Sequence, residues 1–168
     1  IAQNEVLSEV TFSRLINPGR SIPKESIRFH GITDIMVAAE PPATEVLHQF
    51  REFVEDSVLI AHNAAFDMKF LKLKEAETGA VFNNIVLDTL LLSVFLDNDE
   101  SEHSLDAIAE RYGIEIEGRH TALGDSLVTA KVFTQMLDRL EARGITTLYQ
   151  ALRAANKMVH VRKMQQRF

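Results

Sequence analysis

The sequence predicts an α/β fold, in which a β-sheet is covered by helices. Short β-branched runs alternate along the chain with segments whose apolar residues recur at helical spacing. Two of these runs, within residues 57–63 and 83–88, are each followed at once by a helical segment. The chain has 168 residues, of which 46% are hydrophobic and 25% are charged, as in one ordinary globular domain that buries a core.

The composition excludes several classes of protein. The chain contains no cysteine, which excludes a disulfide framework, a thiol nucleophile and a cysteine zinc site, and which fits a reducing compartment. No apolar run approaches the roughly 20 residues that a membrane helix needs, and the first residues do not resemble a signal peptide. We therefore expect a cytoplasmic protein without membrane contact.

The net charge bears on nucleic acid binding. A formal charge of −6 argues against a protein that coats nucleic acid through charge alone, because such binding needs clustered Lys and Arg. An acidic cleft can still hold nucleic acid locally when divalent cations reverse its sign. Basic residues without an intervening acid do gather after residue 150, where they either contact a DNA backbone or form a solvated helix face and tail. These residues are Arg153, Lys157, Arg162, Lys163 and Arg167.

The first part of the chain predicts strands and loops. Residues 6–16 have alternating and β-branched character, which predicts one or two strand segments. Residues 17–26 are rich in Pro and Gly and predict a loop. Thr33 or Asp34 is expected to cap a brief helical turn, which the following proline pair ends.

The middle of the chain predicts a helix, a strand and a second helix. Residues 44–56 place apolar side chains at helical spacing, and residues 57–63 form the kind of β-branched run found in a buried strand. Asn63 is a suitable N-cap for a helix that ends at Gly79. On that helix we expect three apolar side chains to pack on the sheet: Phe66, Phe70 and Leu73.

The second half of the chain is mostly helical in pattern. Residues 83–96 predict a short strand that ends at Asp88 and then a helix, and residues 104–112 predict a compact helix. Residues 122–143 predict a long amphipathic helix, and residues 146–157 a last helix. The expected apolar stripe of the long helix is Leu127, Ala130, Phe133, Leu137 and Leu140.

One candidate site follows the predicted strand, in the segment LIAHNAAFD. The strand leads directly into His62 and Asn63, and Asp67 lies about one turn into the next helix. Ligands of open α/β sheets commonly bind at such strand ends, so Asp67 is a candidate site residue. The alternative is an acid that only stabilises the positive end of the helix dipole.

A second candidate site is the sextet HTALGD. Gly118 interrupts the chain before it, so we expect His120 on a loop and Asp125 in the first turn of the long helix. A histidine with a pKa near 6.5 suits general-base chemistry, and a helix-borne carboxylate suits a metal ion. The alternative is a solvated His beside an acid that stabilises the helix start.

Taken together, the two acids and the His predict metal-assisted hydrolysis. Two-metal phosphodiester chemistry requires several carboxylates, which balance the charge of two cations about 3.5–4 Å apart. Asp67 and Asp125 are too few for this. The residues alone therefore predict an incomplete site.

Five segments in a fixed order add a resemblance. The chain resembles the DEDD-h family of 3′–5′ exonucleases, which includes the epsilon proofreading subunit of bacterial DNA polymerase III, from near residue 1 to about residue 143. The segments are HGIT at 30–33, AHNAAFDMKFL at 61–71, DTLLLS at 88–93, HSLDAIAERYGI at 103–114 and GRHTALGD at 118–125.

The resemblance implies a fold and a chemistry. The fold is ribonuclease H-like, with a mixed β-sheet flanked by helices, and the cofactors are two divalent cations, Mg²⁺ or Mn²⁺. The implied reaction releases nucleoside monophosphates from the 3′ end of single-stranded DNA or RNA. Asp67 and Asp125 match the third and fourth metal acids, and His120 matches the general base.

The same resemblance suggests residues that bind the substrate. Asn63 matches a residue near the substrate, and we add His62 and Phe66 from the same segment. His30 and Ile32, in the HGIT segment, correspond to residues near the terminal nucleotide.

One family motif has no counterpart in the chain. The family begins with a strand that carries Asp-x-Glu, whereas Glu5 and Glu9 are the only acids before residue 24 and match a later strand. We therefore expect the first strand or strands to be absent and an Asp-x-Glu segment to lie upstream. The expected organisation is an N-terminally truncated exonuclease domain at 1–143 and a C-terminal helix with a basic tail or linker at 144–168.

Other functions and residues stay open. One alternative is a non-catalytic module of the same fold that binds nucleic acid, a DNA polymerase or further domains, and another is a hydrolase of small nucleotides. His103, Ser104 and Asp106 contain the letters of a serine-hydrolase triad, but their position predicts a helix cap. Asp88 is either a helix N-cap or a group that supports the site.

Overall fold

A parallel pair of short strands forms the centre of the molecule. The computed structural model describes residues 1, 6, 9–116 and 121–159. In these residues, β1 (Leu59–Ala61) pairs with β2 (Val86–Asp88), so that Ile60 lies beside Leu87. Parallel neighbours require a crossover, which α4 (Ala64–Thr78) provides.

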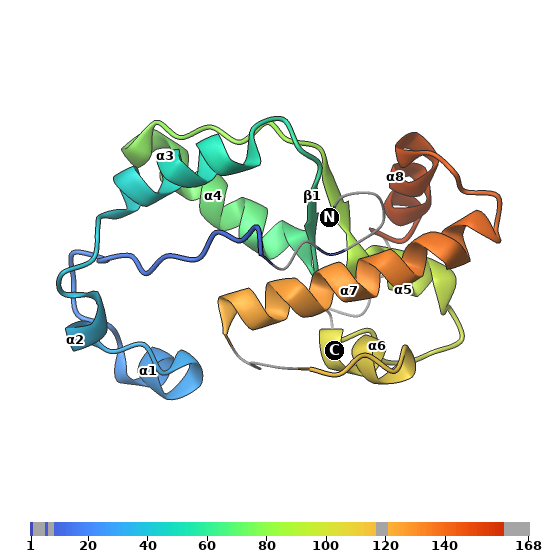
Figure 1. Ribbon diagram of the computed structural model, residues 1–168, viewed down its shortest axis with the longest axis horizontal. Helices are drawn as coiled ribbons and strands as arrows, with labels where there is room; N and C mark the ends of the chain where they lie inside the picture. The colour runs from blue at the N-terminus through green and yellow to red at the C-terminus, as the bar shows by residue number, and fades with distance from the viewer. Residues whose placement is uncertain (2–5, 7–8, 117–120, 160–168) are drawn as a thin grey trace.

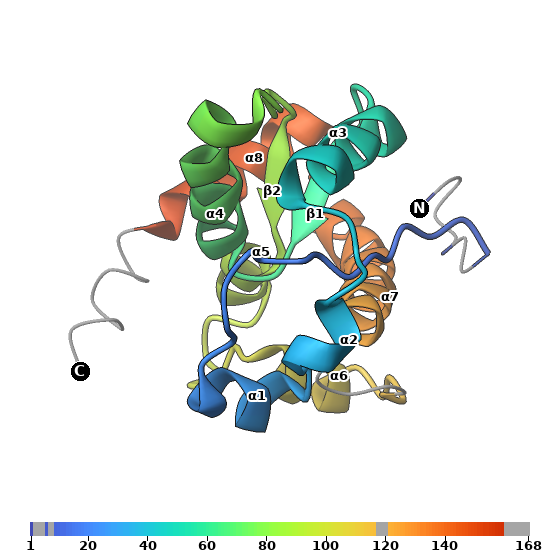
Figure 2. The same cartoon turned by 90° about the vertical axis from the view of Figure 1, so that its left-hand side faces the viewer.

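Helices cover both sides of this strand pair. α4 lies on one side of the strands, and α7 (Ala122–Glu141) lies on the other side and next to β1 (Figure 2). α3 (Ala43–Val54) packs on α4, and α8 (Leu148–Lys157) packs against β2. This arrangement confirms the predicted α/β class.

The remaining helices lie around α7 or apart from the sheet. α5 (Thr89–Leu96) follows β2 directly, and α6 (Leu105–Arg111) packs on α7. α1 (Lys24–His30) and α2 (Asp34–Val37) lie at one end of the molecule, away from the strands (Figure 1). No helix in the described part of the chain is long and apolar enough to cross a membrane.

The main core lies between the strands and the C-terminal helices. Leu92, Ile108, Val132 and Met136 are fully buried there, and Ala155 of α8 belongs to the same cluster. α8 therefore shares the core of the preceding helices, while the expected division of the chain at residue 143 stays a prediction.

The strands predicted at residues 6–16 are wrong. The described residues of this span form no strand, and nearby only an isolated bridge joins Asn17 to Pro42. Phe12 instead packs its ring against those of Phe50 and Phe53, with centroids 5.5 and 5.6 Å apart. A strand needs a partner strand for its backbone, and the described residues offer none here.

A helix also begins where a loop was predicted. α1 starts at Lys24, inside the span predicted as a loop, and continues to His30. Pro23 at its N-cap position explains the error, because proline is common at helix starts as well as in loops.

The apolar stripe of α4 that packs is not the predicted one. Phe66, Phe70 and Leu73 are 60%, 55% and 65% exposed. The side chains that pack inward are Ala64, Met68 and Leu71. Both sets follow the same helical spacing, so periodicity alone could not distinguish them.

The stripe of α7 is shifted in a similar way. Phe133 and Leu140 are buried as predicted, but the centre of the buried face runs through Val128, Val132 and Met136. α7 contacts β1, α5 and α6, so that more than one side of the helix is covered. The helix itself and its start at Ala122 are as predicted.

Candidate functional site

The structure brings the two predicted acids to one cavity. Asp67 of α4 and Asp125 of α7 both line a cavity of about 430 Å³ at the carboxyl end of β1. His62, the first residue after β1, lines it as well. The other lining residues are Ile60, Ala61, Leu105, Ala122, Ser126 and Thr129.

Local sequence explains why each acid lies at the start of a helix. α4 begins directly after the turn that ends β1, and Asp67 lies in its first turn. Thr121 caps α7, because its hydroxyl oxygen accepts a hydrogen bond of 3.1 Å from the backbone N–H of Gly124. Asp125 in turn donates its backbone N–H to the Thr121 carbonyl oxygen at 2.9 Å. The predicted positions of both acids are therefore confirmed, while their chemical roles stay predictions.

The electrostatics of the cavity favour a cation. Desolvation raises the pKa of Asp67, and the nearby Asp88 carboxylate raises it further, while a backbone hydrogen bond lowers it. In the described part of the chain, no Lys, Arg or His forms an ion pair with Asp67 or Asp125. Negative charge gathered without a cation is the condition in which carboxylates bind a hard metal ion.

The described residues supply only part of a metal site. Carboxylate oxygens are the ligands that Mg²⁺ and Mn²⁺ prefer, and the two acids provide them. Within the ranges 9–116 and 121–159, however, no three side chains of His, Asp or Glu are grouped closely enough to hold a metal ion. Among the described residues, the donor set thus fits a divalent cation in kind but is incomplete in number.

The turn between β1 and α4 has an unusual backbone. Asn63 adopts the left-handed conformation, with φ 63° and ψ 43°, and its side chain makes no capping hydrogen bond. Asn63 therefore occupies the predicted N-cap position of α4, and Gly79 ends the helix as predicted, but the expected capping bond from the Asn63 side chain is not formed. The Asn63 Oδ1 atom is buried and has no hydrogen-bond partner among the residues that the structure describes. Because a left-handed backbone turns the side chain away from the helix amides, the amide group of Asn63 does not cap α4.

A buried acid from the next strand replaces the missing cap. The Asp88 carboxylate accepts hydrogen bonds from the backbone N–H groups of Asn63 at 3.0 Å and of Ala64 at 3.1 Å. The same side chain caps α5 by accepting from the Leu90 N–H at 3.0 Å. Asp88 is thus the helix N-cap that was one of the two expected roles, and in the sequence the signal for its second bond, to α4, is only an Asp at the end of a strand.

Phe66 lies beside the cavity rather than inside it. It precedes Asp67 on α4, is 60% exposed and packs edge to face on Phe70, with ring centroids 4.9 Å apart. Its expected contact with a substrate stays a prediction.

His30 and Ile32 lie at a different place from the two acids. They line a separate cavity of about 350 Å³, together with residues of the loop that precedes α1. The His30 Nδ1 atom accepts a hydrogen bond of 3.0 Å from the Ile32 N–H. The structure therefore does not bring these two residues into the cavity of Asp67 and Asp125. His120, the candidate base, lies outside the described residues.

His103 and Ser104, two residues of the apparent serine-hydrolase triad, have structural roles. The Nδ1 atom of the His103 ring is 2.8 Å from Ser93 Oγ, and its Nε2 atom is 3.1 Å from the Glu100 carbonyl oxygen. Ser104 caps α6 by accepting from the Ala107 N–H. The predicted helix cap is confirmed.

Comparisons with known proteins relate the chain to exonucleases and to DNA polymerase III proteins. A sequence model described as exonuclease matches residues 1–133. A DNA polymerase III subunit epsilon-like protein from Rhodobacter capsulatus is 49% identical over 148 residues, which cover 87% of this chain and 21% of that protein. A PolC-type DNA polymerase III from Caldanaerobacter subterraneus is 38% identical over 138 residues, which cover 82% of this chain and 10% of that protein. The chain thus spans about a fifth or a tenth of the length of these relatives.

A solved structure resembles the fold. Exonuclease X in complex with 5′ overhanging duplex DNA superposes with a TM-score of 0.60 at 23% identity, covering 84% of this chain and 78% of that chain. Together with the strand pair flanked by helices, this confirms the expected ribonuclease H-like fold.

Proposed function

The chain belongs to the exonuclease family whose sequence model matches residues 1–133, and we propose that it is the 3′–5′ exonuclease domain of a longer protein. The substrate is the 3′ end of single-stranded DNA or RNA, and the products are nucleoside monophosphates. One observation carries the proposal: Asp67 and Asp125, from two separate helix starts, line one cavity at the carboxyl end of β1 without a cationic partner among the described residues.

Asp67 and Asp125 are the residues that would hold the metal ions, Mg²⁺ or Mn²⁺. Such ions, when bound, polarise a phosphate and activate water. Both carboxylates lie at the starts of helices, which fix their positions. In this proposal His120 is the general base, which removes the proton from the attacking water. His120 lies five residues before Asp125 in sequence, and its role as the base comes from the resemblance to the exonuclease family.

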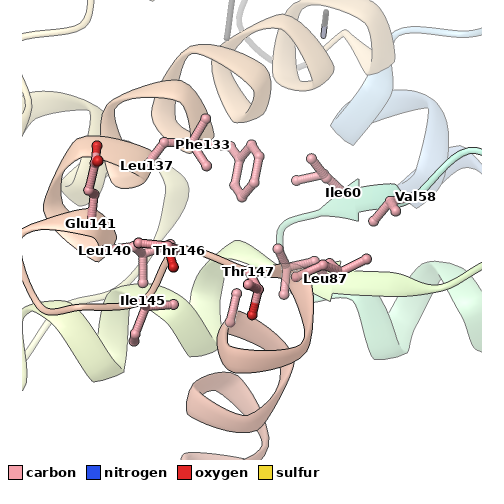
Figure 3. Close-up of a pocket in the computed structure, with 12 residues that line it drawn as sticks. Val58, Ile60, Leu87, Phe133, Leu137, Leu140, Glu141, Ile145, Thr146 and Thr147 are labelled. Carbon is pink, nitrogen blue, oxygen red and sulfur yellow. The ribbon is translucent and has the colours of Figure 1, made fainter. Parts of the chain in front are cut away.

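The remaining metal carboxylates would come from an Asp-x-Glu strand that pairs with the open edge of β1. In the described residues, β1 pairs with β2 on one edge only. Both strands also line an apolar cavity of about 440 Å³, where Phe133 and Leu137 of α7 face Ile60 and Leu87 (Figure 3). A parallel strand is normally paired and covered on both faces, so this edge and cavity suit one further strand. Such a strand would end near the two acids.

The terminal nucleotide would contact the turn after β1. Asn63 and His62 lie on this turn, and Phe66 offers an exposed ring one turn along α4. His30 and Ile32 line a separate cavity, so we propose that they contact a nucleotide further from the 3′ end of the bound nucleic acid.

A DNA polymerase is the proposed partner of the longer protein. The relatives named above are a DNA polymerase III subunit epsilon-like protein and a PolC-type DNA polymerase III, which supports a role in proofreading beside a polymerase, in the cytoplasm. A non-catalytic binding module of the same fold is the second candidate, because the described residues supply only two carboxylates to the cavity.

Product analysis with the full-length protein tests the proposal. We expect a 5′-labelled single-stranded oligonucleotide to shorten stepwise from its 3′ end in Mg²⁺ or Mn²⁺, and a 3′-labelled one to release labelled mononucleotide at once. EDTA should stop both reactions. If neither DNA, RNA nor short oligonucleotides are cut with either metal, the enzyme proposal is wrong and the binding module is favoured. Preference for free nucleotides over polymers would instead indicate a hydrolase of small nucleotides.

A further inference from the structure

We propose that Asp88 is a positioning residue, which holds the first turn of α4 and thereby places Asp67 for metal binding. The proposal rests on the proposed function of the cavity, and it concerns a buried acid that the reaction itself does not use.

The geometry of Asp88 joins three elements. Asp88 lies at the end of β2, and the residue is 7% exposed. Oδ1 accepts from the backbone N–H groups of Asn63 and Leu90, both at 3.0 Å, and Oδ2 accepts from Ala64 at 3.1 Å. One side chain therefore ties the end of β2 to the starts of α4 and α5.

The start of α4 depends on this external support. A helix start leaves backbone N–H groups unsatisfied, and a residue at the N-cap position normally accepts from them. Asn63 does not, because its backbone is left-handed and its side chain makes no capping bond. The left-handed conformation is uncommon outside glycine, although Asn tolerates it better than most residues, and the surrounding structure holds it in place here.

The residue next to Asp88 acts on the same turn. The Thr89 Oγ1 atom is 3.1 Å from His62 Nδ1, and the hydroxyl donates to the Ala61 carbonyl oxygen at 3.4 Å. Asp88 and Thr89 together therefore hold residues 61–64, the turn that leads into α4.

The position of Asp67 follows from this turn. Asp67 lies in the first turn of α4, so a shift of the helix start moves its carboxylate relative to Asp125. Mg²⁺ and Mn²⁺ sites tolerate little displacement of their ligands, and groups that orient a ligand typically affect metal affinity by 10- to 100-fold. The alternative is that Asp88 only stabilises the fold.

Asp88→Asn is a sharp variant for the test. It keeps the shape of the side chain, and its remaining oxygen can still accept from Asn63 and Leu90, so α5 remains capped. Its Nδ2 group, a donor, meets the Ala64 N–H, so the bond to α4 is lost. Asp97→Asn is the matched control, because Asp97 is also a buried acid but binds Arg111 and Arg139 away from the cavity.

Two measurements on the full-length protein test the proposal. Calorimetry gives the dissociation constant for Mn²⁺, and nuclease assays at increasing Mn²⁺ give the concentration for half-maximal activity. For Asp88→Asn we expect the dissociation constant and the half-saturating Mn²⁺ concentration to rise about 10- to 100-fold, with kcat restored by excess Mn²⁺. Asp97→Asn should leave both Mn²⁺ values unchanged although it lowers stability. Mn²⁺ affinities that match wild type in folded Asp88→Asn would overturn the proposal.

A second variant tests the proposal if Asp88→Asn does not fold. Asp88→Ser keeps a hydroxyl that can cap α5, but it is too short to bond Ala64. We expect the amides of Asn63 and Ala64 to exchange hydrogen faster in this variant, together with weaker Mn²⁺ binding. Weaker Mn²⁺ binding with unchanged exchange at these two amides would overturn the positioning role. If the wild-type protein binds Mn²⁺ but cuts no nucleic acid, the proposed function fails, while the binding data still test Asp88.

Discussion

Two groups of acidic side chains in this protein have opposite surroundings. Asp97, at the end of α5, accepts hydrogen bonds from Arg111 at 3.0 Å, from the Tyr112 hydroxyl at 3.2 Å and from Arg139. Asp67 and Asp125 line an open cavity and have no such cation among the described residues.

The pKa values of Asp97 and Asp67 move in opposite directions. Burial acts to raise the pKa of Asp97, but hydrogen bonds and charge from Arg139 and Arg111 outweigh it, and the net pKa is lowered. At Asp67, desolvation raises the pKa and no cation opposes it. The cluster around Asp97 is complete within the chain and stabilises the fold, whereas the cavity is complete only with an external cation.

The largest expected effect is on catalysis at the cavity. Asp125→Asn should lower kcat/KM by about 10³-fold or more, since it removes a metal ligand that acts with the others as a unit. The free energy of unfolding without metal should hardly change. Release of labelled mononucleotide and urea denaturation measure the two effects. Near wild-type activity in Asp125→Asn would contradict a metal-binding role for Asp125, and so the contrast between the acids of the cavity and Asp97.

The next largest effect is on stability at the other group. Asp97→Asn should lower the free energy of unfolding by about 2–3 kcal/mol, because it removes the buried carboxylate that two guanidinium groups share, and among the described residues only that of Arg111 keeps a second acid, Glu100. This loss of stability is smaller than the loss expected on breaking a fully buried ion pair, because the side chain of Arg139 is 39% exposed and water can solvate it. Urea denaturation checks this, with Asp99→Asn as the control, since Asp99 lies nearby on the surface and is exposed. Equal stability of both variants would contradict a structural role for Asp97.

A smaller effect concerns the pH dependence of stability near Asp97. Burial lowers the pKa of His103 below its usual 6.5, so the folded state favours the neutral ring. The stabilisation that His103 provides is complete above pH 6.5 and is lost as the pH falls through its lower folded pKa. His103→Gln should remove this part of the pH dependence. Urea midpoints from pH 8 to pH 5 measure it, and parallel curves for wild type and variant would contradict it.

The smallest effect is a gain of stability at the cavity. Desolvation raises the pKa of Asp67 in the folded protein above its usual value of 3.8. Ionisation of Asp67 therefore destabilises the fold as the pH rises from 3.8 through the raised folded pKa. Asp67→Asn should therefore stabilise the metal-free protein slightly at pH 7, and the gain should disappear below pH 3.8. Mg²⁺ should raise the Tm of wild type but not of the variant. Thermal denaturation with and without Mg²⁺ checks this, and an equal Mg²⁺ effect on both proteins would mean that Asp67 is no ligand.

Features that depend on a few neighbouring residues were predictable. Thr33 and Ser104 cap α2 and α6, and Asp125 lies in the first turn of its helix, as expected. The family could also be identified, because five short motifs keep their order and spacing.

Features that depend on distant partners were not. Whether residues 6–16 form a strand depends on a pairing partner, and which stripe of α4 is buried depends on what covers it. The cap of α4 could not be predicted either, because it comes from Asp88, which lies 24 residues after Ala64.

The sequence by itself thus determined where the helices of the site begin, which acids they carry and to which family the chain belongs. Only the tertiary structure decided that Asp67 and Asp125 meet at one cavity and that Asp88 supports the turn beside them. The physical reason is the sequence distance between the groups involved. Helical turns, and caps made by the residue at the helix start, depend on residues within about four positions, whereas the cap from Asp88 and the cavity form only when elements far apart in the chain pack together.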